Sequence, residues 1–159
     1  AFSLAQDIGV FQNEAKAYMD SYFAKYHGVH AYMTRVVEQA KADGYVTTLF
    51  GRRRDLPELK SSNFNTRSFG ERVALNMPIQ GTAADIIKLA MVNVYNRLKA
   101  EGLKARLILQ VHDELICECP ESEAQTVADI LREEMSGAAK LSVPLTVDAK
   151  IGHSWAEAH

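Results

Sequence analysis

Two apolar runs separated by three polar residues constrain the fold of this 159-residue chain more than any other feature. Residues 105–111 and 115–119 are mostly apolar, and only the polar tripeptide 112–114 lies between them. An insert this short leaves no room for a crossover connection, so we expect two antiparallel strands joined by a tight turn. Pro120 is expected to end the second strand, because proline has no N–H to donate to a ladder.

Apolar residues at helical spacing predict helices on both sides of this hairpin. Residues 2–8 are expected to form a short helix, and a second helix starts at Gln12 or Asn13 and breaks at His27. A third stripe ends at Gly44, since glycine readily adopts the left-handed conformation that terminates helices. The other predicted helices cover residues 67–76, 83–101 and 121–136.

Short elements and breaks connect these helices. Residues 45–49 are aromatic and β-branched, which predicts a strand, and the chain is expected to turn at Gly51. Residues 58–66 are expected to form a polar loop. Pro78 is expected to interrupt a helix, because it lacks the N–H needed for an intrahelical hydrogen bond. Residues 144–151 alternate enough to predict a last strand.

The order of helices, hairpin, helix and strand predicts an α+β fold with helices on one face of a small antiparallel sheet. No run of about 18 apolar residues is present, so no membrane span is expected. The N-terminus does not have the pattern of a signal peptide, and the absence of an initiator Met is a sign of processing or truncation. Cys117 and Cys119 share one side of a strand and are expected to be reduced, buried thiols, which fits the cytoplasm. A Cys-x-Cys metal site is the alternative, but two ligands alone make a poor zinc site.

Charge is distributed unevenly along the chain. Residues 1–43 carry 4 Lys and Arg against 5 Asp and Glu, whereas residues 44–106 carry 11 against 5. Residues 107–159 carry 3 against 10. The middle segment, with its excess of positive charge, is therefore a candidate for an anionic partner. The acidic end could coordinate cations or could simply be a solvated surface.

The acids at the predicted hairpin tip are the first candidates for chemistry. A tight turn can bring Asp113 and Glu114 to the same side, and two close carboxylates repel each other unless a cation is present. Carboxylate oxygens suit Mg²⁺. A polar turn that merely faces water explains the same residues, because Asp is common in turns. A two-metal site also needs further carboxylates, and no other acid lies in a comparable strand-end position.

Arg72, Asn76 and Gln80 recur every four residues and therefore trace one helical stripe. These side chains can reach acceptors in a minor groove or on phosphates. An ordinary polar helix face is an equally good explanation from the pattern alone, and Pro78 could displace the register of Gln80. Residues 52–54 are three consecutive arginines, expected in a basic loop suited to phosphate contacts or in a solvated charge run.

Three stretches together resemble family A DNA polymerases, the bacterial polymerase I type. They are Gly44-Tyr-Val-Thr-Thr-Leu-Phe-Gly-Arg-Arg-Arg54, Glu71-Arg-Val-Ala-Leu-Asn-Met-Pro-Ile-Gln-Gly-Thr-Ala-Ala-Asp85 and Gln110-Val-His-Asp-Glu-Leu115. Residues 152–159 resemble that family's natural C-terminus. The resemblance covers essentially the whole chain. It implies a right-hand polymerase fold, with residues 1–60 in the fingers and residues 61–159 in the palm.

The resemblance also implies roles for particular residues. Asp113 would be the palm aspartate that binds catalytic Mg²⁺, with two ions expected in the complete site. Glu114 would be the adjacent acid near the metals, and His112 would contact the primer terminus. The remaining candidates would bind DNA, four along the minor groove and the last on the backbone: Arg72, Asn76, Gln80, Gln110 and Arg54.

The reaction implied is attack of a primer 3′-OH on the α-phosphate of a deoxynucleoside triphosphate. The expected partners are primer–template duplex, deoxynucleoside triphosphates and the upstream part of the same polymerase, which is monomeric when complete, bacterial and cytoplasmic. The family's other metal-binding aspartate and its triphosphate-binding helix have no matching position here. We therefore expect the isolated chain to be inactive.

Two other functions fit parts of the pattern. A metal-dependent nuclease or phosphatase could use the hairpin acids, but it needs more ligands than this chain offers. A non-catalytic nucleic-acid-binding module could use the basic residues and would be indifferent to loss of the Asp113 carboxylate.

Overall fold

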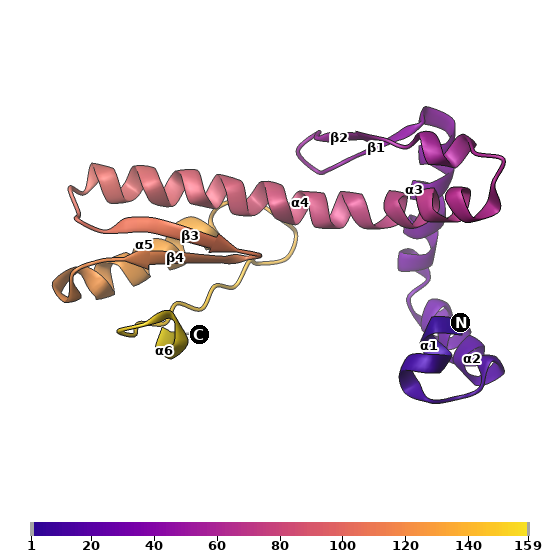
Figure 1. Ribbon diagram of the computed structural model, residues 1–159, viewed down its shortest axis with the longest axis horizontal. Coiled ribbons are helices and arrows are strands. Elements are labelled where there is room, and N and C mark those ends of the chain that lie inside the picture. The colour runs from indigo at the N-terminus through magenta and orange to yellow at the C-terminus, as the bar shows by residue number, and fades with distance from the viewer. Residues whose placement is uncertain (1, 159) are drawn as a thin grey trace. The chain divides into compact units, whose positions relative to one another are not determined.

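Helices make up most of the computed structural model, which describes residues 2–158 (Figure 1). The helices are α1 (Phe2–Ile8), α2 (Gln12–Lys25), α3 (His27–Asp43), α4 (Phe64–Ala100), α5 (Ala124–Ser136) and α6 (Trp155–Ala158). Two antiparallel pairs of strands are present: β1 (Tyr45–Thr47) with β2 (Arg53–Asp55), and β3 (Arg106–Val111) with β4 (Glu114–Glu118). Single 3₁₀ turns cover Pro57–Lys60 and Glu121–Glu123. The chain divides within α4 into two compact units, the first ending at Pro78 and the second beginning at Ile79.

The first unit is held together by a core between α3, the β1–β2 hairpin and the start of α4. Helix α3 ends where Gly44 adopts a φ of 80° and donates its N–H to the carbonyl of Ala40 at 2.8 Å, as the sequence predicted. This left-handed turn directs the chain straight into β1. The buried residues of this core are Ala40, Val46, Leu56, Leu59 and Ala74.

A close approach at Gly70 packs the start of α4 against the turn Pro57–Lys60. A Cβ at this position would lie 3.0 Å from Leu59 Cδ2 and 3.1 Å from the Leu59 backbone nitrogen. We expect Gly70→Ala to lower the free energy of unfolding by about 1 kcal/mol, because the strain of overpacking exceeds the gain in helix propensity. Urea titration measures the change.

A matched control for Gly70 lies in α3. A Cβ on Gly28 would meet no atom within 4 Å. Gly28→Ala should therefore stabilise the protein by a few tenths of a kcal/mol to about 1 kcal/mol, because alanine restricts the unfolded chain more than glycine does. Equal effects of the two substitutions would show that the contact at Gly70 is unimportant.

The second unit packs the end of α4, the β3–β4 hairpin and α5 around a second core. Its buried residues are Val94, Leu98, Ala105, Val127 and Ile130, and Leu115, Cys117 and Cys119 of the hairpin segment pack against them. Hydrogen bonds and ion pairs connect the segments of this unit outside the core. The Glu123 carboxylate accepts hydrogen bonds from the backbone N–H groups of Lys104 and Ala105 at 3.0 Å, and the Arg97 guanidinium lies 3.0 Å from Glu134.

The two cysteines are free thiols that contact the second core, but both are half-buried rather than buried as expected, and Cys119 lies just beyond the end of β4. Burial raises the pKa of Cys117 to about 11, with a smaller contribution from Cys119. Burial also raises the pKa of Cys119, and the Glu123 carboxylate adds to this effect. Both sulfurs are therefore protonated near neutral pH and are poor nucleophiles and metal ligands.

The expected interruption at Pro78 is wrong, because α4 continues unbroken for 37 residues through the proline. A proline has a helical φ of its own, so the helix loses one hydrogen bond and can continue where packing offsets the loss. Ala74 and Met77, one turn before and directly before Pro78, pack on the first core. The helix also begins earlier than residue 67, because the Asn63 side chain accepts hydrogen bonds from the N–H groups of Asn65 and Thr66.

The arginines of residues 52–54 do not form a simple basic loop. Arg53 and Arg54 lie in β2, opposite Thr47 and Val46 respectively, while β1 ends at Thr47 rather than at residue 49. Arg53 is also engaged within the chain, since its guanidinium contacts Asp55 at 2.7 Å and lies 3.8 Å from the centre of the Tyr45 ring. Arg54 is exposed.

The last predicted strand, residues 144–151, is absent, and the strands form two separate pairs rather than one sheet. Residues 145, 147 and 149 are half-buried between exposed neighbours, so the alternation is real. A strand also needs a neighbouring ladder, and none pairs with this segment within residues 2–158. No helix in that described range has the length and apolar character needed to cross a membrane.

Candidate active site and nucleic-acid surface

The β3–β4 hairpin turns over two residues, His112 and Asp113, one fewer than the sequence suggested. Glu114 belongs to β4, where it pairs with Val111. His112 has a φ of 52°, and no other non-glycine residue within 2–158 has a positive φ. Two-residue hairpins require positive φ at the first turn position, because only this twist matches that of the strands. The positive φ of His112 therefore follows from the hairpin register, and it is a strained backbone conformation for a residue with a Cβ.

The turn presents its polar side chains outward. His112 and Asp113 are exposed, whereas Glu114 is half-buried at the start of β4. The amide of Gln110, in β3, donates from Nε2 to the carbonyl oxygen of His112 at 2.8 Å. The structure thus brings Gln110, His112, Asp113 and Glu114 into one short hairpin end.

The carboxylate of Asp113 is a suitable ligand type for Mg²⁺, but too few other ligands lie near it in the described part of the chain. Hard oxygen ligands are what Mg²⁺ prefers. Among residues 2–158, however, no group of three or more His, Cys, Asp or Glu side chains is arranged to hold a metal ion. The donor type fits the ion, and the number of ligands does not. Within residues 2–158 the hairpin end therefore offers oxygen donors but no group of three potential ligands.

The stripe of Arg72, Asn76 and Gln80 lies on α4, and all three side chains are exposed. Because the helix is continuous, Pro78 does not break their four-residue spacing. Arg72 and Asn76 belong to the first unit and Gln80 belongs to the second. Arg72 and Asn76 thus present hydrogen-bond donors to solvent in the first unit, and Gln80 presents one in the second.

The sequence analysis did not identify two exposed aromatic side chains that lie beside arginines at the start of α4. Phe64 and Phe69 are 70% and 47% exposed. The guanidinium of Arg67 lies 5.9 Å from the Phe64 ring, and that of Arg72 lies 6.0 Å from the Phe69 ring. Exposed aromatic faces beside arginines are typical of nucleic-acid surfaces. The signal was present in the sequence as two Phe–Arg pairs, each three residues apart.

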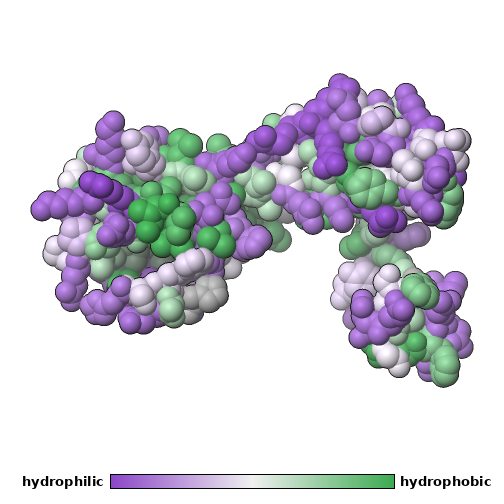
Figure 2. Space-filling view, in the orientation of Figure 1, coloured by the Kyte–Doolittle hydropathy of each residue, from purple (hydrophilic) through white to green (hydrophobic). Residues whose placement is uncertain are grey.

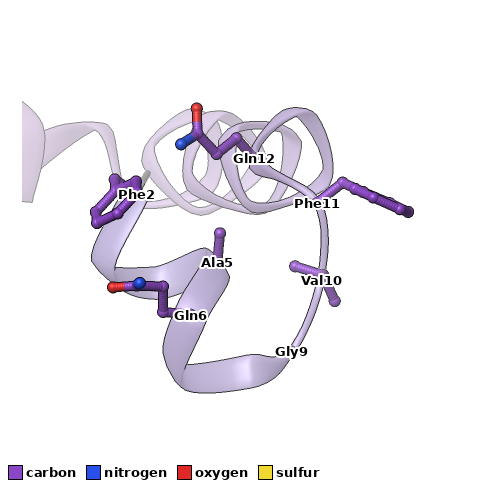
Figure 3. Close-up of a pocket in the computed structure, with 7 residues that line it drawn as sticks. All are labelled: Phe2, Ala5, Gln6, Gly9, Val10, Phe11 and Gln12. Atoms are coloured by element: carbon purple, nitrogen blue, oxygen red, sulfur yellow. The ribbon is translucent and has the colours of Figure 1, made fainter.

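Two hollows, lined by residues of α1, α2 or the loop between them, lie away from these residues. One of about 310 Å³ lies between α1 and α2 and is shown in Figure 3. Its lining includes Phe2, Ala5, Val10 and two glutamines but no charged or nucleophilic side chain. It therefore offers no catalytic group. Figure 2 shows a hydrophobic patch over β3 and β4. In β3, Ile108 and Leu109 are about half exposed.

The sequence profile described as DNA polymerase family A matches residues 1–157. The chain belongs to this family, in agreement with the resemblance in its three motifs.

Named relatives and a solved structure agree with this assignment. The chain is 56% identical to DNA polymerase I of Pseudomonas aeruginosa over 159 residues and 52% identical to DNA polymerase I of Bacillus subtilis over 157 residues. These alignments cover 100% and 99% of the chain but only 17% and 18% of the relatives, so the chain spans less than a fifth of their length. The fold matches the POL domain of Pol1 from M. smegmatis, solved in complex with DNA primer-template and dNTP. The TM-score is 0.94 at 50% identity, over 98% of this chain and 27% of that one.

Proposed function

We propose that the chain is part of a DNA-directed DNA polymerase that extends a primer on a template during DNA replication and repair. The observation that carries this proposal is the agreement, over nearly the whole chain, with a polymerase domain whose structure contains primer-template and dNTP. The reaction forms a bond between the primer 3′-oxygen and the α-phosphorus of the incoming deoxynucleotide. The bond to pyrophosphate breaks, and the proton of the 3′-OH is released.

In this proposal the turn at the end of β3–β4 lies at the chemical step. Asp113 would hold Mg²⁺, with two ions expected in the complete site, and bound Mg²⁺ would supply positive charge to the reacting phosphate. The remaining ligands would come from the rest of the polymerase, since this chain offers too few. Glu114 would lie near the metals, and His112 would contact the primer terminus. The exposure of the turn supports this assignment.

The row of donors on α4 would follow the minor groove of the nascent duplex. That groove presents mainly acceptors, so Arg72, Asn76 and Gln80 could contact it with little dependence on sequence. Gln110 would lie along the same groove, and Arg54 would contact the phosphate backbone. Residues 1–60 would belong to the fingers and residues 61–159 to the palm. The complete protein would be a monomeric cytoplasmic enzyme of a bacterium.

We expect Asn76→Ala, in a complete polymerase carrying this chain, to weaken binding of primer–template by about 1–3 kcal/mol, since it removes a donor from the groove. The dependence of affinity on salt should stay the same. Arg54→Ala should instead make the negative slope of log K against log salt shallower by about 1, because one phosphate contact is lost. Fluorescence anisotropy at several salt concentrations measures both effects.

Asn96→Ala is the matched control, because Asn96 is an exposed asparagine on the same helix, outside the stripe. It should leave duplex affinity unchanged. If Asn76→Ala behaves like Asn96→Ala, the stripe is an ordinary polar helix face.

A further inference from the structure

The side-chain amide of Gln110 is committed to the hairpin turn. Its Nε2 donates to the carbonyl oxygen of His112 at 2.8 Å, two residues along the chain. Gln110 itself is held by the ladder, where it pairs with Leu115. The hydrogen bond therefore connects a strand residue of fixed position to the turn.

The bonded carbonyl belongs to the most constrained residue of the turn. His112 has a φ of 52°, a conformation that costs energy in residues with a Cβ. The carbonyl oxygen of His112 lies in the same peptide plane as the N–H of Asp113. A hydrogen bond that fixes this oxygen therefore fixes the plane from which Asp113 extends. Without it, rotation of that plane would swing the Asp113 carboxylate.

We propose that Gln110 is a positioning residue that holds the His112–Asp113 peptide and thereby aims the Asp113 carboxylate. The inference rests on the proposed function, in which that carboxylate holds Mg²⁺. A positioning role uses a hydrogen bond within the chain, whereas a groove contact uses one to DNA. One of the two N–H donors of Gln110 is occupied by the turn, whereas the Asn76 side chain has no hydrogen bond within residues 2–158.

Gln110→Met tests the proposal, because methionine has a similar length and no donor. Gln125→Met is the matched control: Gln125 is also exposed, and its amide donates to Asp129 at 3.1 Å on α5, away from the turn. Hydrogen exchange of the complete polymerase, without Mg²⁺ or DNA, is followed by mass spectrometry in a peptide covering residues 111–115. We expect exchange there to accelerate about fivefold in Gln110→Met, because this is the effect of losing one hydrogen bond. Exchange should not accelerate in Gln125→Met.

A second readout separates positioning from groove binding. In Gln110→Met the Mg²⁺ concentration for half-maximal primer extension, measured at saturating primer–template, should rise about threefold to tenfold. Loss of a groove contact alone would change the Kd for primer–template and leave this Mg²⁺ dependence as it is. Unchanged exchange in the turn peptide would overturn the proposal, as would a weaker duplex Kd with unchanged Mg²⁺ dependence. A third outcome is faster exchange in Gln110→Met together with primer extension that is unchanged when the Asp113 carboxylate is removed. It would show that the hydrogen bond holds the turn but would refute the proposed function.

Discussion

Replacing Asp113 by Asn in a complete polymerase carrying this chain is expected to slow primer extension by about 10³-fold or more. Asparagine has nearly the same shape and is equally at home in a turn, so the hairpin should form normally. The substitution removes the negative charge that would hold a divalent cation at the exposed hairpin end. Single-turnover extension at saturating primer–template and deoxynucleotide measures the rate.

Glu118→Gln is the matched control for this substitution. Glu118 is an exposed acid at the far end of the same hairpin, opposite Arg106 in the ladder. Its replacement should leave the rate of extension unchanged. The Kd for primer–template should stay within about threefold in Asp113→Asn, since an exposed acid contributes no attraction to phosphate. Normal extension by Asp113→Asn would leave only a non-catalytic binding module as the function of this hairpin.

The isolated 159-residue chain is expected to extend no primer, at least about 10⁴-fold below the complete polymerase. Phosphoryl transfer depends on holding the reacting groups and stabilising charge, and one turn with a single exposed aspartate does neither alone. Within residues 2–158 no three potential ligands come together. Primer extension with Mg²⁺ and all four deoxynucleotides, using the purified chain, measures this directly.

Circular dichroism controls for folding in this experiment, because a largely helical spectrum is expected from α1 to α5. Mg²⁺-dependent extension that disappears in Asp113→Asn would contradict the expectation and show that the chain holds a sufficient site. Mg²⁺-dependent cleavage of DNA, lost in the same variant, would favour the nuclease alternative.

Most of the candidate site could be predicted because its signals are local. The hairpin follows from two apolar runs with a short polar insert at residues 112–114, and the register confirms it, although the turn itself covers only residues 112–113. The four-residue spacing of Arg72, Asn76 and Gln80 places them on one face of any helix that contains them. The bond from Gln110 to His112 could not be predicted, because it depends on the rotamer of one side chain and on the φ of another residue.

The sequence by itself determined the stop of α3 at Gly44 and the presence of the β3–β4 hairpin, although it placed one residue too many in the turn. These features depend on the conformational preferences of neighbouring residues, which act within a few positions. Tertiary structure decided whether α4 continues through Pro78, whether residues 144–151 join a ladder, and whether β1–β2 and β3–β4 form one sheet. Each of these depends on contacts between residues far apart in the chain, and no local pattern specifies them.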